Sequence, residues 1–274
     1  MPRDTKDPGS SDQLQRDRLR RTFGIDAQLY DQMRPSYPAE LFEDLAKRAC
    51  VAPGCRVLEI GPGTGQATVP LAQRGCRLIA VELSPSLAEV ARRKTARFAD
   101  VEIVVAAFED WPLPAEPFDV VVSATAFHWI DPAVRVIKAA DALRPGGVLA
   151  TIATHHVAGG TADFFVDVQR CYEQWDPETT TAQRLPSASE ITEDSEELDR
   201  TGRFDPVTFF RYEWDATYST DDYRRLLLTY SGHIAMDPTD QSGLLDCITT
   251  MIADRYGGRI TKRYLAELRV ACRR

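Results

Sequence analysis

Short apolar runs and longer amphipathic segments alternate along the first 155 residues. The continuous apolar runs predict buried strands over residues 56–60, 77–82, 101–105, 118–123 and 148–153. Apolar positions at helical spacing predict helices over residues 39–50, 65–74, 86–97 and 132–143. Buried strands separated by amphipathic helices are typical of a parallel sheet that is covered on both faces.

The pattern changes after residue 155. It predicts helices over 159–175, 221–231 and 238–256, a strand over 206–214, and a strand or strand–helix mix over 259–272. Residues 171–222 are rich in acidic side chains. This stretch is either a solvated surface or part of a cap, because insertions near the carboxyl ends of parallel strands commonly shape substrate pockets.

Composition and charge disfavour a nucleic-acid-binding, a membrane-spanning or a secreted protein. The 274 residues are 43% hydrophobic and carry a net charge of −8, which disfavours binding to nucleic acid through its phosphates. No apolar run approaches the roughly 20 residues of a membrane span, and the polar N-terminus lacks the apolar core of a secretory signal. The six cysteines form no C-x-x-C pair, so we expect reduced thiols in a cytoplasmic protein.

A glycine-rich turn follows the first predicted strand. Gly61 and Gly63 fit the first two glycines of a dinucleotide-binding loop, but Gln66 stands where the third is required. Pro62 removes a backbone N–H that a pyrophosphate would use, and Glu59 places a carboxylate beside the loop. These features favour a ligand that has a cationic amine and no phosphate.

Glu82 ends the second predicted strand, where a carboxylate can accept hydrogen bonds from ribose hydroxyls. S-adenosylmethionine has a ribose, an ammonium and a sulfonium, and it has no phosphate. We therefore expect this cofactor, with S-adenosylhomocysteine as the product of the reaction.

Four blocks in order resemble the class I S-adenosylmethionine-dependent methyltransferases. They are VLEIGPGTGQATVPLAQRG, VELSPSLAEVARRK, FDVVVSATAFHWIDP and LRPGGVLA. The upstream YDQMRPSYP and the internal FHWID resemble the small-molecule branch that contains trans-aconitate methyltransferase. The resemblance extends from about residue 28 to residue 153 and implies the fold and the cofactor more specifically than the substrate.

The fold that this resemblance implies is α/β: a Rossmann-like, doubly wound, seven-stranded and mostly parallel sheet, with an antiparallel last strand and helical cap elements. We expect a flexible segment over 1–20, lid helices over 21–50 and a cofactor-binding core over 51–156. A cap or substrate insertion over 157–205 is expected next, and residues 206–274 would complete the sheet and the pocket.

The resemblance also implies the cofactor contacts. Glu59 would hold the amino group, Glu82 the ribose hydroxyls, and Leu83 would pack on the adenine. Many family members have an aspartate after the third strand, where this chain has Phe108 and Glu109 as replacements. The expected contacts of the core are Glu59, Gly61, Gly63, Gly65, Glu82, Leu83, Phe108, Glu109 and Ser123.

Tyr30 and Arg34 resemble an N-terminal lid that closes over the cofactor. Arg34 would pair with the cofactor's carboxylate by a charge-assisted hydrogen bond. The alternative for Arg34 is an ion pair at the protein surface.

Three histidines are candidates for acceptor contact or for a general base. His128 follows the fourth predicted strand, while His155 and His156 follow the fifth. Each of them could instead be a structural histidine. Aromatic residues that could form the walls of the substrate pocket, or belong to the core, are Phe127, Trp129, Tyr172, Trp175 and Tyr230.

These features predict methyl transfer to the oxygen, carbon or nitrogen of a small molecule by in-line displacement, in secondary or small-molecule metabolism. No basic cluster for a tricarboxylate is recognisable, so an apolar natural-product scaffold is favoured over trans-aconitate. We expect no metal, no nucleic acid or membrane partner, and a monomer or homodimer. The alternatives are a nicotinamide-dependent oxidoreductase of the Rossmann type, and a binding module without turnover.

Overall fold

A computed structural model describes residues 18–20, 22–176 and 184–274. The segment predicted to be flexible, residues 1–20, lies outside the described residues except for its last three. Among the described helices, none combines the length and the apolar character needed to cross a membrane.

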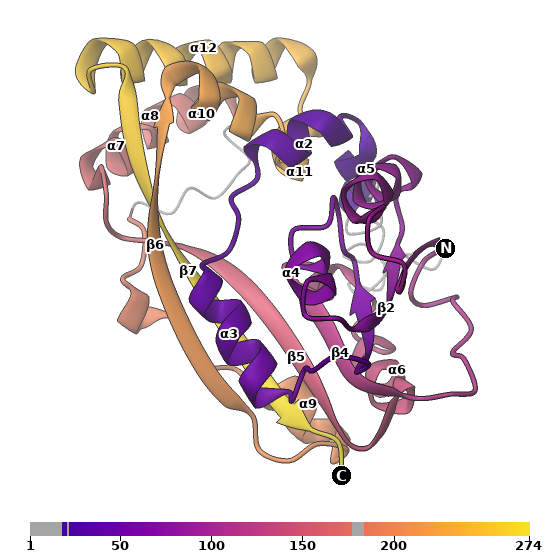
Figure 1. The fold of residues 1–274 in the computed structure, drawn as a ribbon. Helices are drawn as coiled ribbons and strands as arrows, with labels where there is room; N and C mark the ends of the chain where they lie inside the picture. Colours follow the sequence, from indigo (N-terminus) through magenta and orange to yellow (C-terminus); the bar gives the residue numbers. More distant parts are fainter. Residues whose placement is uncertain (1–17, 21, 177–183) are drawn as a thin grey trace, which may run out of the picture.

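Seven strands form one sheet in the order β3-β2-β1-β4-β5-β7-β6 (Figure 1). They are β1 (Arg56–Ile60), β2 (Arg77–Glu82), β3 (Val101–Val105), β4 (Phe118–Ala124), β5 (Leu143–Val157), β6 (Thr208–Ser219) and β7 (Arg259–Cys272). Strands β1 to β5 pair in parallel, whereas β7 runs antiparallel to both β5 and β6. The predicted seven-stranded, mostly parallel sheet with an antiparallel last strand is confirmed.

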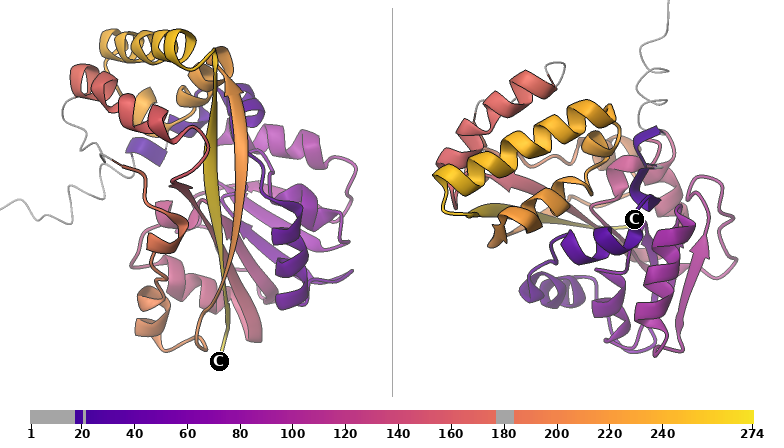
Figure 2. Two further views of the ribbon diagram at one scale, coloured as in Figure 1. Left: turned by 90° about the vertical axis from the view of Figure 1, so that its left-hand side faces the viewer. Right: turned by 90° about the horizontal axis from the view of Figure 1, so that it is seen from above.

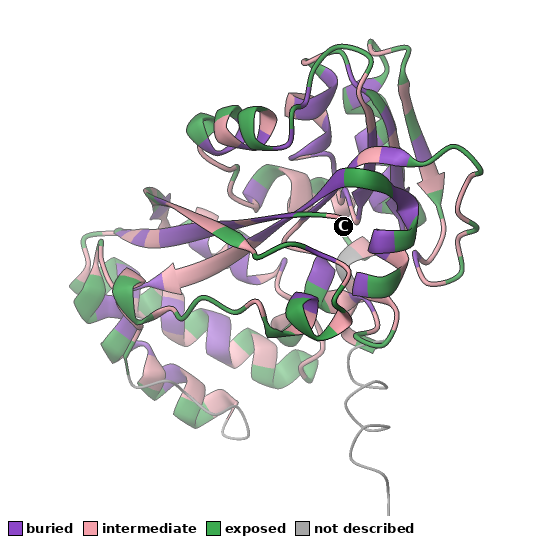
Figure 3. Ribbon diagram, turned by 90° about the horizontal axis from the view of Figure 1, so that it is seen from below, coloured by how far each residue is buried: buried purple, intermediate pink, exposed green. Residues whose placement is uncertain are grey.

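Helices cover both faces of the parallel strands. The first face carries α3 (Ala39–Arg48), α4 (Thr68–Ala72) and α5 (Pro85–Thr95), and the second carries α6 (Arg135–Ala142) and α9 (Glu196–Thr201). Strand β1 shows why apolar residues occur on both of its faces: Val57 packs into the core on the first face, while Leu58 and Ile60 pack into the core on the second. Figure 3 shows buried residues concentrated in the strands and on the inner sides of the helices.

The remaining helices gather over one end of β6 and β7 (Figures 1 and 2). They are α7 (Ala162–Asp167), α8 (Gln169–Trp175), α10 (Thr220–Leu227), α11 (Ser231–Ile234) and α12 (Pro238–Arg255). Phe164, Tyr223, Leu244 and Tyr264 belong to the apolar cluster that joins these helices to the strands. Helix α2 (Ala27–Met33) reaches the same cluster through Met33, so the N-terminal and C-terminal parts pack together.

The expectation of six reduced thiols is wrong for one pair. Cys171 on α8 and Cys247 on α12 form a disulfide with a Cα–Cα distance of 5.8 Å, while Cys50, Cys55, Cys76 and Cys272 are free. The two partners are 76 residues apart. Their proximity comes from the packing of α8 against α12, which the spacing of cysteines in the sequence does not record.

We expect iodoacetamide in denaturant without reductant to label four thiols, and six after reduction. The variant Cys247→Ser should lose about 2–4 kcal/mol of unfolding free energy, because a long loop is no longer closed in the unfolded chain. The variant Cys272→Ser changes an exposed free thiol and should leave stability within about 0.5 kcal/mol. Six thiols labelled without reductant would contradict the disulfide.

Candidate functional site

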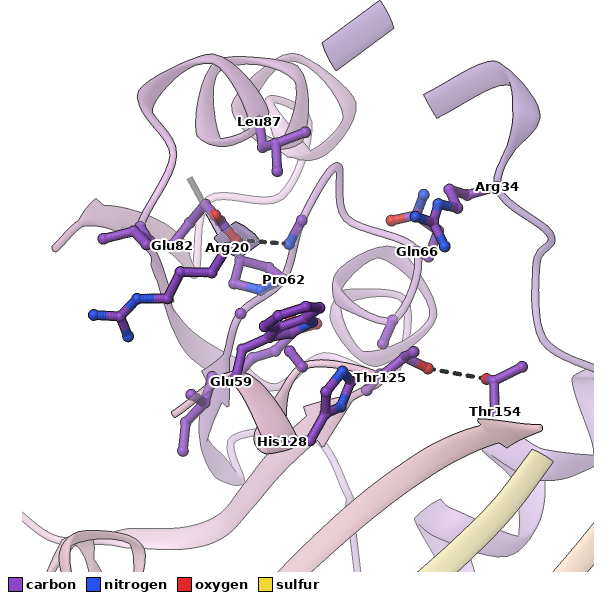
Figure 4. A pocket seen from close by; sticks show the side chains of 18 of the residues that line it. Arg20, Arg34, Glu59, Pro62, Gln66, Glu82, Leu87, Thr125, His128 and Thr154 are labelled. Atoms are coloured by element: carbon purple, nitrogen blue, oxygen red, sulfur yellow. Dashed lines mark hydrogen bonds between the residues drawn. The ribbon is translucent and has the colours of Figure 1, made fainter. Parts of the chain in front are cut away.

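A cavity of about 300 Å³ opens at the carboxyl ends of β1, β2, β4 and β5. Its walls include Ile60 at the end of β1 and Gly61 directly after it, Glu82 at the end of β2, and Ala124 at the end of β4. Figure 4 shows that the side chains of its lining converge from several elements. This edge is where ligands bind in open sheets of parallel strands, because the loops that follow the strands diverge there.

The glycine loop approaches the cavity with a backbone that favours glycine. Gly61 and Gly63 have φ values of +67° and +58°. A Cβ on Gly61 would lie 2.5 Å from the Cβ of Ala126, so glycine is required for space as well as for conformation. Gly65 has a φ of +90°, but it packs toward Ala91 and does not line the cavity.

The variant Gly61→Ala should lose roughly 2–4 kcal/mol of unfolding free energy from backbone strain and overpacking together. Gly54→Ala is the matched control, because Gly54 also has a positive φ of +82° but a Cβ there would meet nothing within 4 Å. Only the strain of roughly 1–2 kcal/mol should remain at that position. Urea denaturation measures both, and equal losses would contradict the close approach at Gly61.

Glu82 connects the glycine loop after β1 with the turn that follows β2. Its Oε2 accepts a hydrogen bond from the Gly63 N–H and its Oε1 accepts one from the Ser84 N–H, both at 2.9 Å. The side chain is buried, and burial raises its pKa while these backbone N–H groups lower it. Glu82 thereby fixes the glycine loop and still presents acceptor lone pairs to the cavity.

Glu59 is the buried carboxylate of the cavity wall. It is 1% exposed, and neither oxygen accepts a hydrogen bond from any described residue. Burial raises the pKa of Glu59 to about 8, although the nearby Thr68 hydroxyl lowers it and Glu82 adds to the rise. Because buried carboxylates are normally hydrogen-bonded, this one is suited to a ligand that brings a cation or several N–H donors.

An ion pair between Arg20 and Glu109 lines the cavity beside the loop that follows β3. Leu83, Phe108 and Glu109 line the cavity, as does Arg20, whose Nη1 lies 2.6 Å from Glu109 Oε1. The same Glu109 oxygen accepts a hydrogen bond from the Asp131 N–H at 3.2 Å. Glu109 is therefore held by protein groups, and no sequence pattern predicted its contact with Arg20.

Helix α2 and the segment after it line a further side of the cavity. The Arg34 guanidinium lies over the rings of Tyr30 and Tyr230, at 4.9 and 4.6 Å from their centroids, and donates to the Thr229 carbonyl. Tyr30, Arg34 and Tyr230 all line the cavity. Residues distant in sequence thus meet around one cation.

His155 and His156 are neighbours on β5, so their side chains point to opposite faces of the sheet. His156 lines the cavity, whereas His155 points to the opposite face beside Glu267 and Arg269. Burial lowers the pKa of His156 to about 2 and that of His128, which also lines the cavity, to about 4. Burial also lowers the pKa of His155.

Six predicted site residues, His155 and Gly65 among them, lie outside the cavity lining. The Ser123 hydroxyl donates to the Ile60 carbonyl at 2.9 Å in the core, and Phe127 packs under α6. Tyr172 bonds His233 at 3.0 Å, and Trp175 packs against Gly243. In each case the side chain fills a gap between elements, which its position in the sequence does not reveal.

Three hydroxyls that the sequence analysis missed line the cavity. Tyr37 Oη lies 2.7 Å from Thr125 Oγ1, which lies 2.9 Å from Thr154 Oγ1 (Figure 4). Thr125 has a φ of +52°, a strained value for a β-branched residue, and such strain is concentrated at functional sites. Only Tyr37 had a sequence signal, because it belongs to the RPSYP part of the lid block.

Comparisons with known proteins agree with this geometry. Residues 58–151 match the model of a methyltransferase domain. An uncharacterized methyltransferase of Mycobacterium tuberculosis is 36% identical over 131 residues, which are 48% of this chain and 51% of that protein. The chain therefore spans about half the length of such curated relatives.

Solved structures share the sheet. A protein of Anaeromyxobacter dehalogenans described as a candidate type II methyltransferase has a TM-score of 0.56 and 25% identity, covering 88% of this chain and 97% of its own. A second structure is a Haemonchus contortus phosphoethanolamine N-methyltransferase in complex with phosphomonomethylethanolamine and S-adenosylhomocysteine. It has a TM-score of 0.52 and 19% identity, and the match covers 94% of this chain and 59% of that one. Residues 58–151 are thus similar to a methyltransferase domain, and the likeness in fold extends over most of the chain.

Proposed function

We propose that the protein transfers a methyl group from S-adenosylmethionine to a small-molecule acceptor. The observation that carries this proposal is the pair of buried carboxylates at the carboxyl ends of adjacent strands, Glu59 without a protein partner and Glu82 beside the glycine loop. Glu59 would hold the ammonium of the cofactor and Glu82 its ribose diol. Arg34 would pair with its carboxylate, and Leu83 and Phe108 would flank its adenine.

S-adenosylmethionine supplies an electrophilic methyl group on a sulfonium. The protein's part is to align the acceptor with that methyl group and to exclude water, which accelerates an in-line displacement. His128 and His156 face the cavity at the ends of β4 and β5, where an acceptor would lie beyond the sulfonium. Because both are neutral at pH 7, they can accept or donate one hydrogen bond without adding charge.

The alternative of a nicotinamide-dependent oxidoreductase is disfavoured by charge. Three carboxylates line the cavity, Glu59, Glu82 and Glu109. They would repel a pyrophosphate, and Pro62 offers no N–H at the turn. A sulfonium and an ammonium would instead be attracted by the same carboxylates.

Activity is tested with methyl-labelled S-adenosylmethionine and a panel of small acids, phenols and amines. We expect labelled product and S-adenosylhomocysteine with some panel members, and strongly reduced turnover in Glu82→Ala. Stabilisation of the protein by nicotinamide cofactors, with none by S-adenosylhomocysteine, would contradict the proposal.

A further inference from the structure

The acceptor side of the cavity is a wall built by one face of the antiparallel strands. Strand register places His156 of β5 opposite Tyr264 of β7, and Trp214 of β6 opposite the same tyrosine. Residues opposite one another in a sheet point to the same face. Trp214 and Tyr264 stack at 5.2 Å between centroids, and all three residues line the cavity.

Lys262, two residues before Tyr264 on β7, points to the same face of the sheet and lies beside this wall. It is 3% exposed, and its Nζ donates to Tyr230 Oη at 3.2 Å. Its Nζ is also 5.3 Å from the ring centroid of Tyr230 and 5.4 Å from that of Tyr264. Among the described residues, no carboxylate forms an ion pair with Lys262, although buried lysines are almost always paired.

Charge is therefore divided between the two ends of the cavity. The three lining carboxylates come from β1, β2 and the loop after β3, at the cofactor end. Arg34 and Lys262 both contact Tyr230, and because Arg34 would pair with the carboxylate of the cofactor in the proposed complex, Lys262 is the cation left at the acceptor end. Figure 4 shows Arg34 on the other side of the cavity from Glu82. An acceptor that enters past Tyr230 meets the hydroxyl to which Lys262 donates, in a protein whose net charge is −8.

His156, on the acceptor side of the cavity, is poorly suited to remove a proton from an acceptor. Burial and the nearby Lys262 and Arg34 lower the pKa of His156 to about 2, so it is a weak base. An acceptor that is already ionised at neutral pH needs no base.

We propose that the acceptor is a monocarboxylate with an apolar, aromatic body. Its body would pack on Trp129, Trp214 and Tyr264, and its carboxylate would accept a hydrogen bond from the Tyr230 hydroxyl, to which Lys262 donates. Lys262 is then a positioning residue that acts through Tyr230. This assignment rests on the proposed methyltransferase function.

The reaction that follows is balanced without a proton transfer. A lone pair of the carboxylate oxygen forms the O–C bond to the methyl group, the C–S bond breaks, and its electron pair stays on sulfur. An anion and a sulfonium become a methyl ester and a neutral thioether. A cavity that excludes water favours this loss of opposite charges.

Three probes with one apolar body test the charge preference: phenylacetate, phenylacetamide and phenethylamine. The protein is first saturated with S-adenosylhomocysteine, and melting is followed at pH 7. A ligand of this size is expected to bind with a Kd of about 1 mM. At tenfold excess over this Kd, phenylacetate should raise the Tm by about 2–4 °C, and the other two by clearly less.

Two variants should abolish that preference. Lys262→Met removes the charge at similar volume and should fold at least as stably, because an ammonium without a carboxylate partner is no longer buried. Tyr230→Phe keeps the ring beside Arg34 but removes the hydroxyl. Both should retain stabilisation by S-adenosylhomocysteine, and Lys47→Met, which changes an exposed lysine on α3, should behave as wild type.

The carboxylate assignment is overturned if no probe shifts the Tm, if the amide or the amine matches phenylacetate, or if both Lys262→Met and Tyr230→Phe keep the preference. Failure of the proposed function looks different, since S-adenosylhomocysteine itself would then not stabilise wild type, and the acceptor assignment would fall with it.

Discussion

Replacing Glu82 with alanine is expected to lower the affinity for S-adenosylmethionine about a hundredfold. The side chain holds the glycine loop through the Gly63 N–H and the following turn through the Ser84 N–H. In the proposed complex it also accepts hydrogen bonds from the ribose hydroxyls. Its loss removes charge-assisted bonds to the ligand and loosens the backbone that contacts it, so two effects act in the same direction.

Calorimetric titration of wild type, Glu82→Gln and Glu82→Ala measures this effect. Glutamine keeps one acceptor oxygen and should give an intermediate affinity. Glu89→Ala is the control, because Glu89 is an exposed carboxylate on the neighbouring helix α5. Unchanged affinity in Glu82→Ala would show that the ribose assignment is wrong.

Replacing Glu59 with glutamine is expected to stabilise the ligand-free protein at alkaline pH by up to about 5 kcal/mol. The pKa of Glu59 rises from 4.5 to about 8 in the folded state, because burial disfavours the charged form. A carboxyl group with a raised pKa contributes stability that is fully present below its unfolded pKa. That contribution is lost as the pH rises from about 4.5 through about 8.

Urea unfolding of wild type and Glu59→Gln at pH 5 and pH 9 isolates this contribution, because other titrating groups cancel in the difference. The cofactor should reverse the effect, since its ammonium stabilises the ionised Glu59. Wild-type affinity for S-adenosylmethionine should therefore rise between pH 6 and pH 8 more than the affinity of Glu59→Gln does. Parallel stability and affinity profiles for the two proteins would contradict the role of this carboxylate.

The sequence predicted the parallel core because each of its strands is buried on both faces. Val57, Leu58 and Ile60 must all be apolar to pack against helices on the two sides of β1, so the strand is apolar on both faces and only Glu59 interrupts it. Glycines that need a positive φ, such as Gly61 and Gly63, leave an equally local signal.

The acceptor side could not be predicted in the same way. Tyr230, Lys262 and Trp214 come together through the register of β6 with β7 and through the packing of the segment around α11. Neither the strand register nor this packing produces a recognisable spacing of residues in the sequence. The same reason explains the Cys171–Cys247 disulfide. It also explains why Tyr172 packs against His233 and Trp175 against Gly243, outside the cavity.

The most direct test of the account is calorimetric titration of the wild-type protein with S-adenosylmethionine and S-adenosylhomocysteine at pH 7.5. We predict one site per chain with a micromolar Kd for both ligands, and no binding of nicotinamide dinucleotides. No detectable binding of either sulfur ligand, or tighter binding of a dinucleotide, would contradict it.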